Sequence, residues 1–268
     1  MIRKPAVAGA FYPSNPEELT SMIKGMVDLE REKKKALAVI SPHAGFIYSG
    51  PVAGALFSSV QLPGKYVLLG PSHRMISSKA ALMRTGAWST PFGDIPVDSE
   101  LADFILSSSA ILDEDEEAHR NEHSLEVQLP FIQYFVKHFS IVPISIGYQV
   151  SYEELEELGR AIAQGIKKSG LEALIVASTD MSHYVAQSTA QELDFMAIKM
   201  IQELNPRGLY DIVTSKNISM CGFQPTTSAL VASCDLGAKA ASLVKYQTSG
   251  DVSGNYDEVV GYAGIVIE

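Results

Sequence analysis

Three stretches, each an apolar run followed by polar residues with a histidine, decide the fold: LAVISPHAG at residues 37–45, YVLLGPSHR at residues 66–74 and LIVASTDMSHY at residues 174–184. Each apolar run is typical of a buried strand. In an open parallel sheet, the residues just past the carboxyl ends of the strands line the ligand crevice. We therefore expect the polar side chains of these segments to converge in one site. They are His43, His73, Asp180 and His183.

Predicted strands and helices alternate along most of the chain, which is typical of an α/β fold. Predicted strands cover residues 37–40, 66–69, 141–146, 174–178, 242–247 and 259–267, with shorter edge strands between residues 80 and 97. Predicted helices cover residues 16 to about 35, 51–60, 98–107, 151–168, 190–204 and 206–213, with further helices beginning within 122–135 and 221–227. We therefore expect a single domain over residues 1–268, with a central, mostly parallel sheet flanked by helices.

Capping residues mark several of the predicted helix starts. Asn15 precedes a first-turn proline, Asp98 precedes an apolar run, and SYEE at residues 151–154 forms a capping box. The acidic run DEDEE at residues 113–117 is predicted to be a hydrated loop, because contiguous carboxylates repel one another.

The composition limits the classes of partner. The chain has 268 residues and a formal net charge of −10, which argues against nucleic acids and anionic membranes because both need a basic surface. Residues 1–14 lack the apolar core of a secretory signal, and no apolar run approaches the roughly 20 residues that span a bilayer. We therefore expect a cytoplasmic protein whose two cysteines, Cys221 and Cys234, are thiols.

Two histidines in equivalent positions indicate a transition-metal site. His43 and His73 each follow a predicted strand, and two imidazoles need only one sulfur or carboxylate to complete a minimal site. Cys221 is predicted to be that third ligand, because it lies where a helix begins and a helix N-terminus lowers a thiol pKa. Cys234 lies among apolar residues and is predicted to be packed.

Two carboxylate and histidine pairs are candidates for acid and base catalysis. Asp180 and His183 are three residues apart, so they become neighbours if a helix begins in this turn. The aspartate could then orient an imidazole and the histidine could move protons; the alternative is a helix cap beside an exposed histidine. His123 and Glu126 have the same spacing and form a second candidate pair, with capping by Glu126 as the alternative.

The remaining histidines and the serines support no further site. His119 and His138 have no comparable context and are expected on the surface. Serines also adjoin three of the candidate histidines, but the chain has no G-x-S-x-G nucleophile elbow, so a serine hydrolase is only weakly indicated. Nucleotide-cofactor and dithiol motifs are absent from the sequence as well.

Seven motifs in order resemble those of the Memo family, named for the mediator of ErbB2-driven cell motility. They are PAVAGAFYPS, SPHAGFIYSG, GPSHR, EHSLEVQLP, STDMSHY, MCGFQP and GYAG. The resemblance implies a fold like that of class III extradiol dioxygenases, which hold a non-haem iron with two histidines and a glutamate. The matching metal ligands would be His43, His73 and Cys221, with Asp180 and His183 nearby. A thiolate in place of a carboxylate favours softer metals, so copper or iron is expected, zinc is possible and ring cleavage is not expected.

The resemblance also implies two different functions. The first is a metal-binding redox protein or oxidoreductase that acts on a small-molecule substrate. The alternative is a non-catalytic module that binds a peptide or protein in the same crevice, as described for the animal protein with phosphotyrosine peptides. Prokaryotic members often accompany a radical-SAM protein and an AMMECR1-like protein, which implies a functional association with them. We expect the first of these functions.

Overall fold

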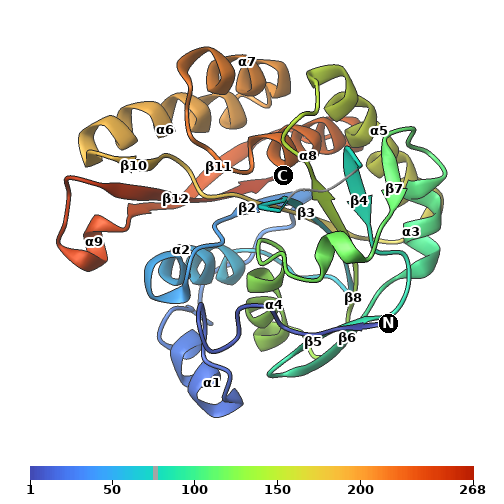
Figure 1. The fold of residues 1–268 in the computed structure, drawn as a ribbon, viewed down its shortest axis with the longest axis horizontal. Helices are drawn as coiled ribbons and strands as arrows, with labels where there is room; N and C mark the ends of the chain where they lie inside the picture. Colours follow the sequence, from blue (N-terminus) through green and yellow to red (C-terminus); the bar gives the residue numbers. More distant parts are fainter. Residues whose placement is uncertain (75–77) are drawn as a thin grey trace.

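The computed structural model, shown in Figure 1, describes residues 1–74 and 78–268. The centre of its large sheet is parallel, in the order β2, β9, β3 and β8. These strands cover Ala38–Ser41, Leu174–Ser178, Lys65–Pro71 and Ser140–Ile146. β2 and β3 follow one another along the chain, but in the sheet β9 lies between them and pairs with both.

The margins of this sheet are largely antiparallel. β12 (Val259–Ile267) runs antiparallel to β2, and both β10 (His183–Val185) and β11 (Ala241–Thr248) pair antiparallel with β12. At the other margin, β4 (Ala80–Leu82) is antiparallel to β8, and β7 (Leu112–Glu114) is parallel to β4. The α/β class is confirmed, whereas the sheet is mixed rather than mostly parallel.

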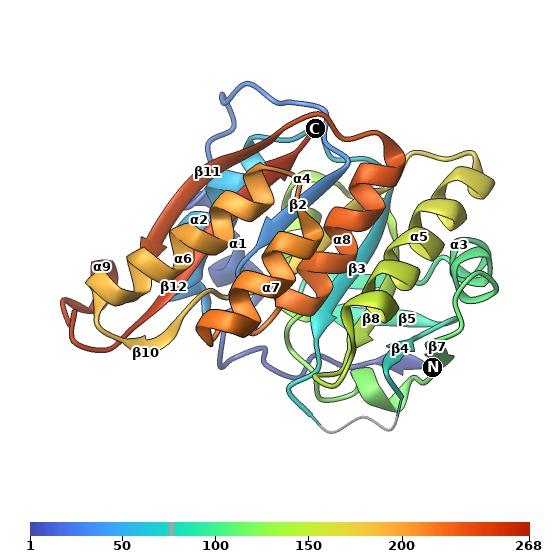
Figure 2. The same ribbon diagram turned by 90° about the horizontal axis from the view of Figure 1, so that it is seen from above.

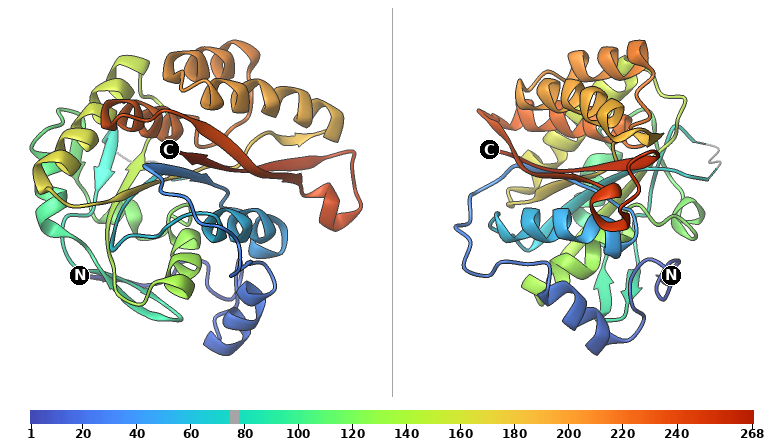
Figure 3. Two further views of the ribbon diagram at one scale, coloured as in Figure 1. Left: turned by 180° about the vertical axis from the view of Figure 1, so that it is seen from behind. Right: turned by 90° about the vertical axis from the view of Figure 1, so that its left-hand side faces the viewer.

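Helices cover both faces of the large sheet, as Figures 1 and 3 show. Figure 2 shows the helices of one face lying side by side: α3 (Ser99–Leu106), α5 (Tyr152–Ser169), α6 (Gln187–Gln202), α7 (Pro206–Lys216) and α8 (Phe223–Leu236). The other face carries α1 (Pro16–Lys24), α2 (Phe46–Ser58), α4 (Leu129–Phe135) and a small sheet of β1 (Ile2–Arg3), β5 (Ala87–Thr90) and β6 (Gly93–Pro96). The short α9 (Gly250–Ser253) connects β11 to β12.

The sheet separates two apolar cores. Successive side chains of a strand point to opposite faces, so Val67 and Leu69 of β3 pack into the core beneath α5 and α8, whereas Leu68 packs into the core on the α2 and α4 side. All three side chains are fully buried. Burial on both faces explains why the central strands are continuous apolar runs rather than alternating ones.

Local signals place most helix starts correctly. Asp98 accepts a hydrogen bond from the backbone NH of Leu101, and Ser151 and Glu154 form the predicted capping box. The helix predicted at residues 51–60 instead begins at Phe46, whose NH donates to the Phe11 carbonyl, and Pro51 lies inside it.

Two predictions about the fold were wrong. The helix predicted to continue from residue 16 to about 35 ends at Lys24, and the sheet predicted to be mostly parallel is mixed. The condition for Asp180 and His183 to be helical neighbours is not met, because the chain enters β10 at His183 and pairs there with the start of β12. The acidic run at residues 113–117, predicted to be a loop, is only partly one: residues 113 and 114 end the edge strand β7, and residue 117 begins a short 3-10 helix. None of the helices in the described ranges combines the length and apolar character that crossing a lipid bilayer requires.

Candidate metal centre

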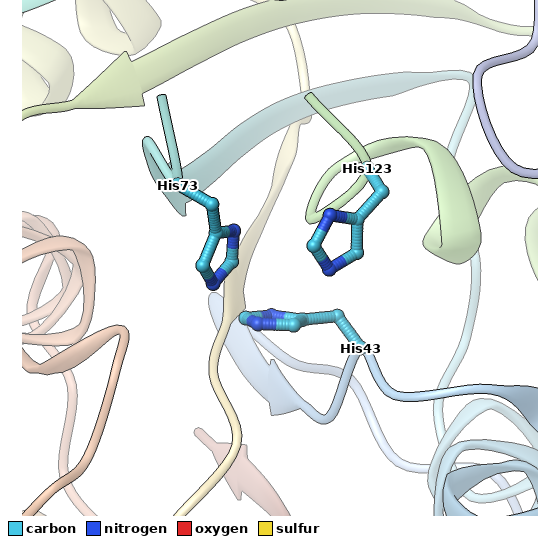
Figure 4. A group of neighbouring side chains, drawn as sticks. All are labelled: His43, His73 and His123. Carbon is cyan, nitrogen blue, oxygen red and sulfur yellow. The ribbon is translucent and has the colours of Figure 1, made fainter. Parts of the chain in front are cut away.

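Three histidines meet at the carboxyl ends of the central strands. His43 follows β2, His73 follows β3, and His123 lies between two short 3-10 helices, η1 (Glu117–His119) and η2 (Glu126–Gln128). Each offers a ring nitrogen, and these nitrogens all lie within 4.8 Å of one another. Figure 4 shows the three rings facing one common space. The cluster combines a predicted pair of metal ligands with a histidine that was predicted for acid and base catalysis.

The buried carboxylate of Glu122 holds the ring of His73 and the backbone of His123. Its Oε1 atom lies 2.9 Å from Nδ1 of His73 and accepts from the backbone NH groups of His123 and Ser124 at 2.8 Å each. Its Oε2 atom accepts from the backbone NH of His73 at 2.6 Å. Burial by itself raises the pKa of Glu122, but the hydrogen bond and charge of His73 and the NH of Ser124 outweigh it and lower the pKa to about 2.

The carboxylate also determines the tautomer of His73. A carboxylate can only accept, so Nδ1 of His73 carries the proton and Nε2 presents a lone pair. Sequence analysis does not single out Glu122, because its partner His73 is 49 residues away in the chain.

A second hydrogen-bond chain determines the tautomer of His43. Ser178 Oγ donates its proton to the Ser124 carbonyl at 2.6 Å, so Nδ1 of His43, 2.9 Å from the same Oγ atom, must be a donor. Nε2 of His43 therefore presents a lone pair. Burial, and then the neighbouring imidazoles of His73 and His123, lower the pKa of His43 well below its usual value. The ring is thus neutral near pH 7, as a metal ligand must be.

Cys221 lies beside this cluster without belonging to the group of three. Its Sγ atom is 3.2 Å from Nε2 of His43, and the backbone NH of Asp180 donates to it at 3.3 Å. The cysteine does precede the helix α8, as predicted. Its predicted low pKa is wrong, however, because burial and then the negative charge of Asp180 raise the pKa of the thiol.

Asp180 and His183 both line the cleft, but their contacts differ from those of a helical pair. Asp180 Oδ1 accepts from the backbone NH of His43 at 2.7 Å, so it positions the loop of that histidine rather than its ring. Burial raises the pKa of Asp180, against the opposing effect of this hydrogen bond. Nδ1 of His183 lies 2.8 Å from the Ser219 carbonyl, so Nδ1 carries the proton and Nε2 of the neutral ring can accept one.

The histidines open into a cleft of about 260 Å³. Its lining combines the three histidines of the cluster, the Asp180 and His183 side chains, and aromatic and small residues from four parts of the chain. The complete lining is Phe11, His43, Ala44, Gly45, His73, His123, Asp180, His183, Tyr184, Val260 and Tyr262.

Comparison with known proteins identifies the family. The family model described as Memo-like protein matches residues 3–266. The chain belongs to the Memo family. It is 44% identical over 269 residues to a MEMO1 family protein of Methanosarcina mazei, and this match covers 100% of this chain and 99% of the relative. It is 41% identical over 275 residues to the MEMO1 family protein MTH_45 of Methanothermobacter thermautotrophicus, and this match covers 98% of this chain and 99% of the relative.

One solved structure is similar to this Memo-family chain in fold. The crystal structure of an uncharacterized protein of Escherichia coli K12, JW3007, superposes with a TM-score of 0.58 and 14% sequence identity. The match covers 87% of this chain and 100% of that chain. At this identity the likeness concerns the fold alone, so a relation to class III extradiol dioxygenases stays a prediction.

Glu126 is buried and does not line the cleft. It forms an ion pair with Arg3, and it accepts hydrogen bonds from the backbone NH groups of Ala6 and Val7 and from the hydroxyl of Tyr12. These contacts hold the N-terminal segment against the loop that carries His123. In this position the carboxylate anchors the chain, and its contacts do not pair it with His123 as the spacing predicted.

The prediction that His119 lies on the surface was wrong, whereas His138 is exposed as expected. His119 is fully buried, its ring centre is 5.7 Å from that of Trp88, and its carbonyl accepts from Nε of Arg3. Burial, and then the charge of Arg3, lower the pKa of His119 to about 4. A neutral histidine therefore fills this part of the core of the Memo-family chain.

The raised pKa of Cys221 leads to a prediction about thiol reactivity. The prediction that Cys234 is packed was wrong, because it is exposed. In metal-free protein at pH 8, we expect iodoacetamide to modify Cys234 at least about tenfold faster than Cys221. The pKa of both thiols is raised, but the deeper burial of Cys221 raises its pKa much further, and each unit lowers the thiolate fraction about tenfold. Peptide mass spectrometry over a time course measures both rates. Equal rates, or faster modification of Cys221, would contradict the electrostatic environment described above.

Proposed function

We propose that this protein is a metal-dependent oxidoreductase in which His43, His73 and His123 hold one transition-metal ion. The observation that carries the proposal is the convergence of three imidazoles within 4.8 Å, with lone pairs of His43 and His73 directed by hydrogen bonds on their other ring nitrogens. Metal-binding histidines typically donate their second nitrogen to a carboxylate or another acceptor in this way.

The donor atoms of Cys221 and His43 are spaced as two ligands of one metal ion would be. Bonds of about 2.0–2.3 Å to nitrogen and sulfur place two donors of one ion roughly 3–4 Å apart. Cys221 Sγ and His43 Nε2 are 3.2 Å apart, within that range, so Cys221 is a candidate for a further ligand. Imidazoles suit copper, iron and zinc, and a thiolate among them favours copper or zinc over magnesium or calcium.

A bound copper or iron ion would supply one-electron redox chemistry. The chain itself supplies the binding groups, a proton acceptor and an enclosed space. Nε2 of His183, whose Nδ1 faces the Ser219 carbonyl, can exchange a proton with a ligand in the cleft, and Asp180 holds the loop of His43 through its backbone NH. The substrate in this proposal is a small organic molecule that fits a cleft of about 260 Å³.

Metal analysis of protein purified without oxygen and without an affinity tag tests the proposal. We expect about one transition-metal ion per chain. Replacing a residue that hydrogen-bonds to a metal ligand typically weakens metal binding by roughly 10- to 100-fold, and His123→Ala, which removes a ligand itself, should weaken it more. Cys234→Ser serves as the control, because Cys234 is exposed and distant from the histidine cluster in sequence, and its metal affinity should stay unchanged.

Two results would contradict this function. An affinity in His123→Ala equal to that of the wild type would remove this histidine from the ligand set, and Cys221→Ser would then identify the third ligand. Metal-independent binding of a peptide, together with no reversible redox couple in metal-loaded protein, would favour the non-catalytic binding module instead.

A further inference from the structure

The closing motif GYAG at residues 261–264 brings a tyrosine to the cleft that the proposed chemistry does not use. Tyr262 lies near the start of β12, which is joined to the loop of the acid and base candidates. The NH of Met181 donates to the Gly261 carbonyl at 2.8 Å, and the NH of Gly261 donates to the Ser182 carbonyl at 2.9 Å. This pairing places Tyr262 in the same cleft lining as His183.

The hydroxyl of Tyr262 is free for a ligand. The side chain is only 2% exposed, yet it lines the cleft, and within the described residues no hydrogen bond to this hydroxyl is found. Two other deeply placed tyrosines have partners, since Tyr12 donates to Glu126 and Tyr246 donates to Asp194. The hydroxyl of Tyr66, in an apolar core, has none among the described residues. A buried phenol usually finds a hydrogen-bond partner. Tyr262 differs from Tyr66 in that it lines a cleft, where a bound molecule can supply that partner.

The surroundings keep this phenol protonated. Burial, followed by the negative charge of Asp180, raises the pKa of Tyr262, so the group is an O–H donor throughout the physiological range. Nε2 of His183 in the same lining is an acceptor. The cleft therefore presents one donor and one acceptor to an occupant, in addition to the three imidazoles.

We propose that Tyr262 is a ligand-binding residue whose hydroxyl donates a hydrogen bond to an oxygen atom of a compact organic molecule in the cleft. The chemical class is a molecule that carries a carboxylate or a similar acceptor oxygen. This inference rests on the proposed function, since it takes the cleft to be a substrate site. The volume of about 260 Å³ is slightly below the range of about 300–1,000 Å³ that is common for small-molecule pockets, which favours a compact ligand.

The test uses 4-fluorobenzoate as the probe and follows its 19F NMR signal in titrations of zinc-loaded protein. Tyr262→Phe removes one oxygen atom and keeps the ring, so it should weaken probe binding by at least about tenfold, as expected for a lost hydrogen bond to a charged group. Tyr66→Phe is the matched control. The hydroxyl of Tyr66 is buried without a partner among the described residues, and it lies in the core on the α2 and α4 side rather than in the cleft.

Zinc content, measured separately for each variant, distinguishes this inference from the proposed function. Tyr262→Phe should hold as much zinc as the wild type, because the phenol is outside the ligand cluster. Equal probe affinity in Tyr262→Phe and wild type, an equal loss in Tyr66→Phe, or no probe binding by wild-type protein would overturn the inference. A wild type that holds no metal contradicts the proposed function instead, and the same titration of metal-free protein then still tests Tyr262.

Discussion

Replacing Glu122 by glutamine is expected to weaken metal binding by about 10- to 100-fold, the usual effect of removing a group that orients metal ligands. Both oxygens of Glu122 accept hydrogen bonds, from Nδ1 and the NH of His73 and from the NH groups of His123 and Ser124. Glutamine keeps one accepting oxygen and turns an NH₂ group toward donors. The ring of His73 and the loop of His123 would then lose their common anchor.

Competition titrations with a chromophoric chelator measure the affinity, and urea unfolding of metal-free protein measures stability separately. Glu117→Gln is the matched control, because Glu117 is an exposed carboxylate of the same segment whose ion pair is with Arg120. Its metal affinity should equal that of the wild type. If Glu122→Gln also binds metal as tightly as the wild type, Glu122 does not orient the ligands.

Replacing Glu126 by alanine is expected to lower the free energy of unfolding by about 3–5 kcal/mol, because it leaves the buried charge of Arg3 without its partner. The substitution also removes the acceptor for the NH groups of Ala6 and Val7 and for the Tyr12 hydroxyl. The guanidinium of Arg3 would keep its bonds to the carbonyls of His119 and Glu122, which do not neutralise its charge.

Urea unfolding monitored by circular dichroism gives the difference in free energy. Glu156→Ala is the control for an exposed pair, since Glu156 contacts Arg160 one helical turn away at 3.0 Å, and it should cost less than about 1 kcal/mol. A similar small loss in Glu126→Ala would show that the Arg3 network contributes little to stability, and a direct role for Glu126 in the chemistry would then regain support.

The central strands could be predicted because their signals are local. The strand predicted at 174–178 has the observed bounds of β9, and β2, β3 and β8 differ by one or two residues at either end. Each is a short apolar run that ends at a turn, as expected for strands buried on both faces. The antiparallel direction of β12 and the strand β10 depend on pairing between segments far apart in the chain, which no local pattern specifies.

The residues of the candidate site could likewise be predicted only where they directly follow a central strand. His43 and His73 were placed together because both follow central strands, and the structure brings them into one cluster. His123 follows no strand, and its position depends on Glu122 and on the Arg3 network below it. The thiol of Cys221 shows a related limit: the helix start is visible in the sequence, but the burial and the nearby carboxylate that raise its pKa belong to the folded state.

The position of β9 between β2 and β3 has a consequence for how the centre forms during protein synthesis. The strands that carry His43 and His73 leave the ribosome early, yet they become neighbours in the sheet only through β9, which is made about 100 residues later. Ser178 at the end of β9 also holds the ring of His43. A nascent chain that ends before β9 therefore lacks both the strand that joins β2 to β3 and the Ser178 hydroxyl that holds the ring of His43, so the three histidines cannot converge until β9 has been made.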